Sequence, residues 1–185
     1  MNSTATETET SKGSERLKKT GSTSRRAESL ARRIEEGAAG LAAFAETLSE
    51  TEWSKAVLES GGNSRPVGVV VHHVATVYPI EIQLAQAIAS GNAVTEVTWE
   101  VVAQLNGKHA QENASISKAA ALELLRRNSQ EAAAAVRAFT DDDLDQAAPF
   151  SLSFGAPVTA QFVIEDHALR HSWHHLARIR KTLGR

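Results

Sequence analysis

Histidine is the residue type in this chain that could do the most chemistry. The chain has 185 residues and seven histidines, and six of the seven fall in two clusters. The members of these clusters are His72 and His73, and then His167, His171, His174 and His175. Neutral imidazole binds Zn, Ni, Fe and Cu. The question is therefore which of these histidines face the same interior.

His73 falls within an apolar stripe of the helix expected over residues 64–90. A helix turns about 100° per residue, and by that measure five apolar residues lie within about 60° of His73. They are Val70, Val77, Ile80, Leu84 and Ile88. His72 lies about 100° away, beyond the edge of the stripe. An imidazole in such a stripe costs free energy unless both ring nitrogens find partners, so helical phase selects His73 as the inward histidine.

His171 and His175 lie one turn apart along one margin of the apolar face of the last helix, expected over residues 158–183. A histidine pair at this spacing can chelate one ion, as in the HExxH helix of zinc proteases. His167 and His174 turn the other way, and either could replace a member of the pair if the helix rotates slightly. Three neutral nitrogen donors with open coordination positions are typical of a catalytic metal site.

Other interpretations of these side chains stay open at this point. A core histidine is usually just hydrogen-bonded, and an i, i+4 pair often lies on a solvated face. Glu165 and Asp166 could orient a ligand histidine from behind or lie on the surface. Arg178 could bind an anionic substrate or extend along the surface. A di-iron site is rejected because the sequence has no Glu-x-x-His pair.

A shorter helix, expected from Thr98 to Asn113, carries the remaining histidine. Asn106, His109 and Asn113 share one face of it with apolar residues. This pattern indicates either a pocket next to the metal or a hydrogen-bonded patch. In the first case His109 would act as acid or base, or hold a substrate carboxylate. His109 and Asn106 are therefore the candidate catalytic residues.

Composition narrows the function classes. The formal net charge is -2, so no broad basic field points to nucleic acid or an anionic membrane. No apolar run approaches the roughly 18 residues of a membrane span, and the N-terminus has no apolar signal region. There are no cysteines, so any thiol must come from outside. We therefore expect a cytoplasmic protein with a small-molecule substrate, no nucleic-acid partner and no membrane.

The elements that must position these residues are almost all helices. Residues 1–26 are rich in Ser and Thr and predict a disordered tail, and residues 27–185 predict one domain. Helices are expected over 27–49, 64–90, 98–113, 117–139 and 158–183, with a single turn at 140–144 and a short extended piece at 150–154. Ser64 should cap the second helix, and Pro79 should kink it. The prediction is an all-α four-helix bundle with a short extra helix.

Residues 67–75 (VGVVVHHVA) and 171–180 (HSWHHLARIR) resemble the DinB-like superfamily, which includes mycothiol-dependent maleylpyruvate isomerases. The resemblance covers roughly residues 27–184. It implies a four-helix bundle with a divalent ion (Zn, Ni or Fe) between helices, on His73, His171 and His175. It further implies a low-molecular-weight thiol such as mycothiol or bacillithiol, in a transferase or isomerase, and a homodimer. The alternative is a non-catalytic metal-binding or stress-related bundle.

Overall fold

The structure is a computed structural model that describes residues 24–58 and 63–185. Most of the predicted tail lies outside these residues. The first helix, α1 (Arg25–Glu46), begins two residues earlier than the sequence suggested. Its N-cap is Ser24, whose hydroxyl accepts a hydrogen bond from the N–H of Ala27 at 3.0 Å. Arg25 and Arg26 therefore belong to the bundle and not to the tail.

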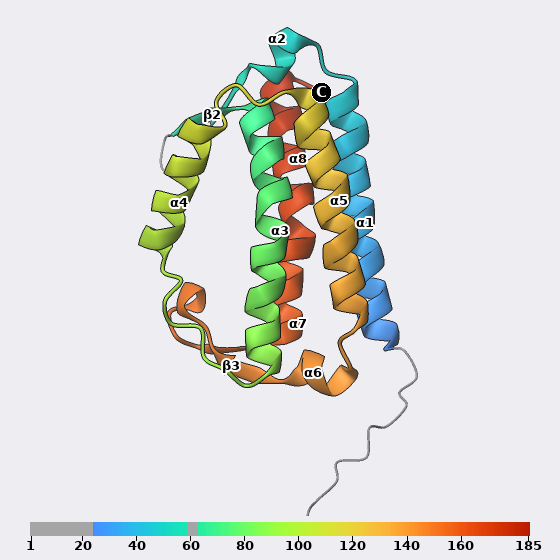
Figure 1. Cartoon of the computed structure of the whole chain (residues 1–185), viewed down its shortest axis with the longest axis vertical. Helices are drawn as coiled ribbons and strands as arrows, with labels where there is room; N and C mark the ends of the chain where they lie inside the picture. Colours follow the sequence, from blue (N-terminus) through green and yellow to red (C-terminus); the bar gives the residue numbers. More distant parts are fainter. Residues whose placement is uncertain (1–23, 59–62) are drawn as a thin grey trace, which may run out of the picture.

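The prediction of an all-α four-helix bundle is confirmed (Figure 1). The four long elements are α1, α3 (Val67–Ala89), α5 (Lys118–Arg137) and a C-terminal run made of α7 (Ala160–Val163), a π-helical segment η3 (Ile164–Leu169) and α8 (Arg170–Leu183). Helices α1 and α3 each pack against both α5 and α8. In Figure 1, α1 and α8 run upward while α3 and α5 run downward. The neighbours α3 and α5 are thus parallel.

A parallel pair needs a connection that brings the chain back to the starting end. Helix α4 (Trp99–Glu112) is that connection, and it runs upward outside the bundle (Figure 1). It is the short extra helix that the sequence predicted. Helices α4 and α5 begin where expected, with the hydroxyls of Thr98 and Ser117 accepting a hydrogen bond from the backbone three residues on.

The predicted cap at Ser64 is wrong. Ser64 belongs to β2 (Ser64–Pro66), which pairs antiparallel with β1 (Ala56–Leu58). A short helix, α2 (Glu50–Trp53), precedes this hairpin. Helix α3 starts without a side-chain cap, and the N–H of Val67 donates instead to the carbonyl of Lys55 at 3.0 Å. The residue before β1 therefore supplies the hydrogen-bond acceptor that the sequence assigned to a capping serine.

Pro79 lies inside α3 without ending it. A proline at this position cannot donate to the carbonyl of Ala75, four residues earlier. The side-chain amide of Asn128, on α5, donates to that carbonyl at 2.8 Å and is itself buried. A neighbouring helix thus supplies the hydrogen bond that proline removes, which keeps a buried carbonyl paired.

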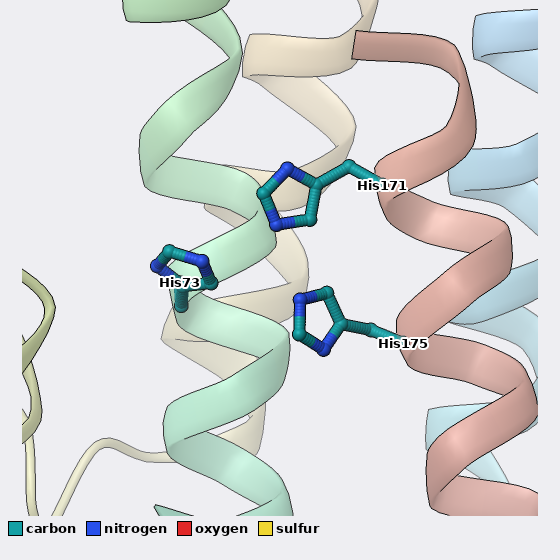
Figure 2. Close-up of side chains that lie close together, drawn as sticks. All are labelled: His73, His171 and His175. Atoms are coloured by element: carbon teal, nitrogen blue, oxygen red, sulfur yellow. The ribbon is translucent and has the colours of Figure 1, made fainter. Parts of the chain in front are cut away.

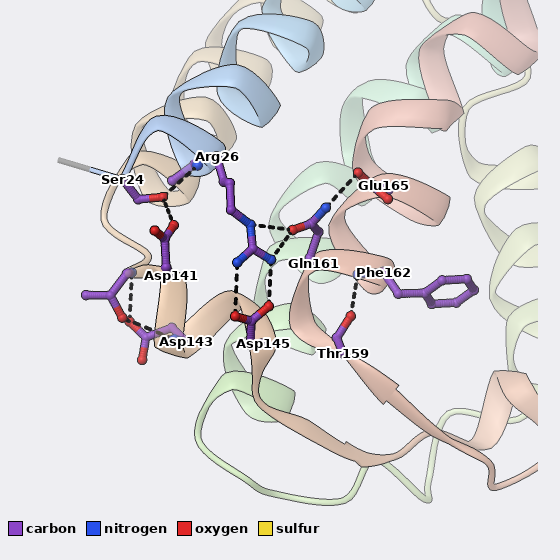
Figure 3. A network of polar contacts seen from close by, with 11 residues as sticks. Ser24, Arg26, Asp141, Asp143, Asp145, Thr159, Gln161, Phe162 and Glu165 are labelled. Carbon is purple, nitrogen blue, oxygen red and sulfur yellow. Dashed lines mark hydrogen bonds and ion pairs between the residues drawn. The ribbon is translucent and has the colours of Figure 1, made fainter.

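The lower end of the bundle is closed by short elements. They are α6 (Asp141–Asp145), the hairpin strands β3 (Ala147–Pro149) and β4 (Pro157–Thr159), and a 3-10 turn, η2 (Ser151–Ser153). The extended piece predicted at 150–154 is wrong, because these residues form the tip of the hairpin and the strands flank them. Figure 3 shows Arg26 bound to Asp145 and Gln161, and Ser24 bound to Asp141, which ties α1 to this end.

Helix α3 is, within the described residues, the one helix long and apolar enough to cross a bilayer. The sequence gives no uninterrupted apolar run here, because polar or charged residues occur along the whole helix; they are His72, His73, Thr76, Glu81, Gln83 and Gln86. In the structure, 61% of its most apolar window is buried inside the bundle. A core helix passes the same length and composition test, so the finding is weak evidence for a membrane.

Candidate metal centre

Helices α3 and α8 bring His73, His171 and His175 together (Figure 2). One ligand nitrogen from each residue lies within 4.8 Å of the other two. The His171 and His175 rings stack with centroids 4.8 Å apart, as expected for residues one turn apart, and the His73 ring lies 5.1 and 5.6 Å from them. Within the described residues this is the one group of three or more candidate ligands.

The chemistry of the three side chains fits a divalent ion. His73 and His175 are each 5% exposed, and burial holds the pKa of both well below its ordinary value, with a further contribution from the neighbouring His171. They are therefore neutral at pH 7, which is the form that binds metal. Metal–imidazole bonds of about 2.1 Å place ligand nitrogens about 3–4 Å apart, so side-chain shifts of about 1 Å would close the triad.

Glu81 is the residue that the sequence analysis missed. It lies eight residues after His73 on α3, is 5% exposed, and its Oε1 is 2.5 Å from Nδ1 of His171. This contact fixes the His171 ring and leaves its Nε2 for a ligand bond. A carboxylate behind a histidine ligand is a recurrent feature of metal sites, because it orients the ring and raises its basicity.

The carboxylates expected to do this are turned elsewhere. Glu165 accepts a hydrogen bond from Gln161 at 3.0 Å, and Asp166 pairs with Arg170 at 3.1 Å. Both lie in or beside the π-helical segment, which has a different angular step from an α-helix and ends just before His171. Segments of this kind are frequent at functional sites. Here the segment sets the rotation of α8 about its axis, so that His171 and His175 face α3.

The other two histidines of the C-terminal cluster are outside the triad. His167 packs its ring edge-on against Phe150, with centroids 5.5 Å apart, and lies 3.9 Å from Asp166. His174 is exposed, and its ring meets the edge of His175 at 5.2 Å. The expectation that one of them could replace a ligand finds no support in this geometry.

His109, on α4, lies beside the triad. Its Nε2 is 2.9 Å from Nδ1 of His72, and its ring is 5.6 Å from that of His73. Burial, with smaller contributions from His72 and Arg65, lowers the pKa of His109 to about 4, so the ring is neutral at pH 7. Asn113 donates to the backbone carbonyl of His109 at 2.8 Å, and Asn106 is half-buried on the same face of α4. The structure thus places His109 beside the triad, whereas Asn113 binds the backbone at the end of α4.

Several solved structures share this fold, and three of them are described here. YfiT from Bacillus subtilis, described as a probable metal-dependent hydrolase with an unusual four-helix bundle topology, is 18% identical with a TM-score of 0.66 over 89% of each chain. A mycothiol-dependent maleylpyruvate isomerase is 15% identical with a TM-score of 0.62, over 83% of this chain and 60% of that one. The colibactin self-resistance protein ClbS is 17% identical with a TM-score of 0.67, over 90% and 99%.

At these identities the likeness establishes the fold and no activity. ClbS was solved in complex with double-stranded DNA, so proteins of this fold include one with a nucleic-acid partner. That does not fit our exclusion of nucleic acid, which rested on net charge alone. No curated protein matches the sequence. The family model of the DinB superfamily matches residues 33–179, and the chain therefore belongs to the DinB superfamily.

Proposed function

We propose that this protein is a divalent-metal-dependent enzyme acting on small molecules, with His73, His171 and His175 as the metal ligands. The observation that carries the proposal is the convergence of three imidazoles from two helices, one of them held from behind by Glu81. Three protein ligands leave coordination positions open for a substrate. The geometry does not distinguish among Zn, Ni and Fe, so the proposal covers all three ions.

The chain's own residues would have distinct roles. Glu81 orients His171, and the burial of His73 and His175 keeps both rings neutral. His109 is also neutral at pH 7 and lies next to His73, but a ring with a pKa of about 4 is a weak base, so we assign it a hydrogen bond to the nucleophile and not the proton transfer. A bound divalent ion would supply Lewis acidity that lowers the pKa of a thiol or a water molecule.

We favour an external low-molecular-weight thiol as the nucleophile, in an S-transferase or isomerase reaction on a small electrophile. The chain has no cysteine of its own, and a structural neighbour is described as mycothiol-dependent. Hydrolysis by water is the second candidate, because another neighbour is described as a probable metal-dependent hydrolase. A bundle that binds metal without catalysis is the third. We expect the protein to act in the cytoplasm. We also expect it to form a homodimer, which analytical ultracentrifugation would check.

Elemental analysis of protein purified without a histidine tag tests the first step. We expect about one ion per chain in the wild type, much less in His73→Ala and His171→Ala, and no loss in His174→Ala, the matched control on the exposed side of α8. Full metal content in both ligand variants would overturn the ligand assignment. No metal uptake by the wild type at neutral pH would overturn the proposal.

The reaction is tested next with the metal-loaded protein. Conjugation of a generic electrophile is followed with several thiols, and hydrolysis of ester and amide substrates is followed in parallel. A rate above the thiol-only background that disappears in His171→Ala supports thiol transfer. Turnover without thiol supports hydrolysis instead, and neither activity in a fully loaded protein supports the non-catalytic bundle.

A further inference from the structure

The three candidate ligands come from two helices that run in opposite directions (Figure 1). Helix α3 carries His73, and α8, which packs against it, carries His171 and His175. An ion held by all three side chains would lie between the two helices (Figure 2). Its bond lengths therefore depend on how far α8 is shifted along α3, which is the register of the pair. A slide of about 1 Å is large for a site with metal–nitrogen bonds of about 2.1 Å.

A hydrogen bond between two buried hydroxyls joins these helices next to the site. The phenol oxygen of Tyr78, on α3, lies 2.6 Å from Oγ of Ser172, on α8, and both residues are 0% exposed. Ser172 directly follows His171, and Tyr78 lies one turn before Glu81. Neighbouring turns of α3 are thus bonded to the first turn of α8 twice, through Glu81 to His171 and through Tyr78 to Ser172.

The rest of the buried surface of these two helices does not define a register as sharply. The structure describes both helices completely, and apart from the metal-site residues and this pair their buried residues are apolar. Apolar contacts have no preferred direction, so they tolerate a small slide. A hydrogen bond is less tolerant, because a slide of about 1 Å breaks it and leaves hydroxyls unpaired in the core. A buried polar residue specifies the register of coiled coils in the same way.

We propose that Tyr78 is a positioning residue of the metal centre, whose hydrogen bond to Ser172 sets the register that brings the two ligands of α8 within bonding distance of an ion on His73. The inference rests on the proposed function and adds to it the contact that assembles the site from its two helices. Glu81 bonds to the ring of one ligand, whereas Tyr78 bonds to a residue that is not a ligand and so acts on α8 as a whole. Burial raises the pKa of the Tyr78 phenol above its ordinary value, so at neutral pH the group stays protonated and neutral.

The test removes the hydrogen bond from either side and measures the binding of Co(II). Tyr78→Phe removes one hydroxyl and Ser172→Ala the other, and in Tyr78→Phe the serine can still bond to its own helix. We expect each variant to weaken Co(II) binding by roughly 3- to 10-fold. The d–d absorption bands, which report coordination geometry, should change as well. The double variant should lose no more affinity than either single variant, because all three lack the same contact.

Ser129→Ala is the matched control, because it also removes a buried hydroxyl. The Ser129 hydroxyl donates to the carbonyl of Arg126 in the same helix, α5, at 3.1 Å. We expect this variant to keep the wild-type Co(II) affinity and spectrum, even if its melting temperature falls. A purely structural role for Tyr78 would lower the melting temperature of Tyr78→Phe and leave affinity and spectrum unchanged, and that result overturns the proposal. An equal loss of affinity in Ser129→Ala would also contradict it.

A distance between the helices tests the register without a metal. The chain has no cysteine, so Gln83→Cys on α3 and Lys181→Cys on α8, both at exposed positions, can be spin-labelled as a pair. If the wild type binds no Co(II), the proposed function has failed, and the distance distribution between the labels decides the role of Tyr78 alone. We expect Tyr78→Phe to shift or broaden this distribution, and Ser129→Ala to leave it unchanged. The same distribution in Tyr78→Phe as in the wild type refutes the role in register.

Discussion

Replacing Glu81 by Gln should weaken metal binding while leaving the bundle intact. Glutamine has nearly the same shape as glutamate, and its carbonyl oxygen can still accept the hydrogen bond from Nδ1 of His171. The variant therefore preserves the ring orientation and removes the charge. Because Glu81 is 5% exposed, water does little to replace that charge.

The expected size follows from the type of hydrogen bond that is lost. A hydrogen bond to a charged group contributes about 1.5–3 kcal/mol, against about 0.5–1.5 kcal/mol for a neutral one. The difference, about 1–1.5 kcal/mol, corresponds to roughly tenfold in dissociation constant. Glu81→Ala also removes the acceptor and should approach the roughly 100-fold upper end seen for partners of metal-binding histidines.

Competition with a chromophoric chelator measures the zinc dissociation constant of each variant at pH 7.5. Glu165→Gln is the matched control, since it removes a carboxylate on the same C-terminal run that bonds to Gln161 and not to a histidine. Equal zinc affinity for Glu81→Gln and wild type, with both folded, would refute the role assigned to Glu81. A similar loss in Glu165→Gln would show that net charge, and not the contact with His171, sets the affinity.

Three further predictions concern stability. Asn128→Ala should cost about 1–3 kcal/mol of unfolding free energy, because it leaves a buried carbonyl unpaired. The cost should be smaller in a Pro79→Ala background, in which residue 79 again has a backbone N–H for that carbonyl. Equal costs in both backgrounds would contradict this account. Gly68→Ala should cost about 1–3 kcal/mol in chemical denaturation, since a Cβ there lies 2.4 Å from the Trp53 ring, whereas Gly107→Ala, with nothing within 4 Å, should be neutral or stabilising. In metal-free protein, the pKa values of His73 and His175 are lower in the folded state than in the unfolded chain, so the unfolded chain binds more protons. The stability present above about pH 6.5 should therefore fall as the pH drops. Urea unfolding from pH 7.5 to 5 measures this, and a flat profile would contradict it.

Local signals in the sequence were enough for most of the helices. The capping hydroxyls of Thr98, Ser117 and Thr140 each accept a backbone hydrogen bond from the residue three positions on, as their sequence positions predict. Ser64 has the same sequence signal but does not cap a helix, because it pairs across the hairpin with Leu58 instead. Strand pairing is a non-local contact, and a single candidate cap contains no information about it.

The phase argument chose the histidine of α3 that lies beside His171 and His175, but for a partly wrong reason. It put His73 at the middle of the buried face, yet Ile80, on the predicted stripe, is 45% exposed. The buried face is centred about 120° further round, and His73 lies at its margin. Helix α3 is apolar on nearly every side, so periodicity defines its inner face poorly. Its single charged residue, Glu81, was the better signal, because a lone carboxylate in a buried helix needs a partner.

The order of the helices explains why α4 contributes to the site at all. None of the 14 residues of α4 is buried, so packing alone gives this helix little reason to lie where it does. Because α3 and α5 run parallel, however, the chain must return along the outside of the bundle. That return passes the margin of α3 where His73 lies, and it places His109 against both His72 and His73. The connection that follows α3 therefore supplies a side chain beside the triad, while the bundle supplies the triad itself.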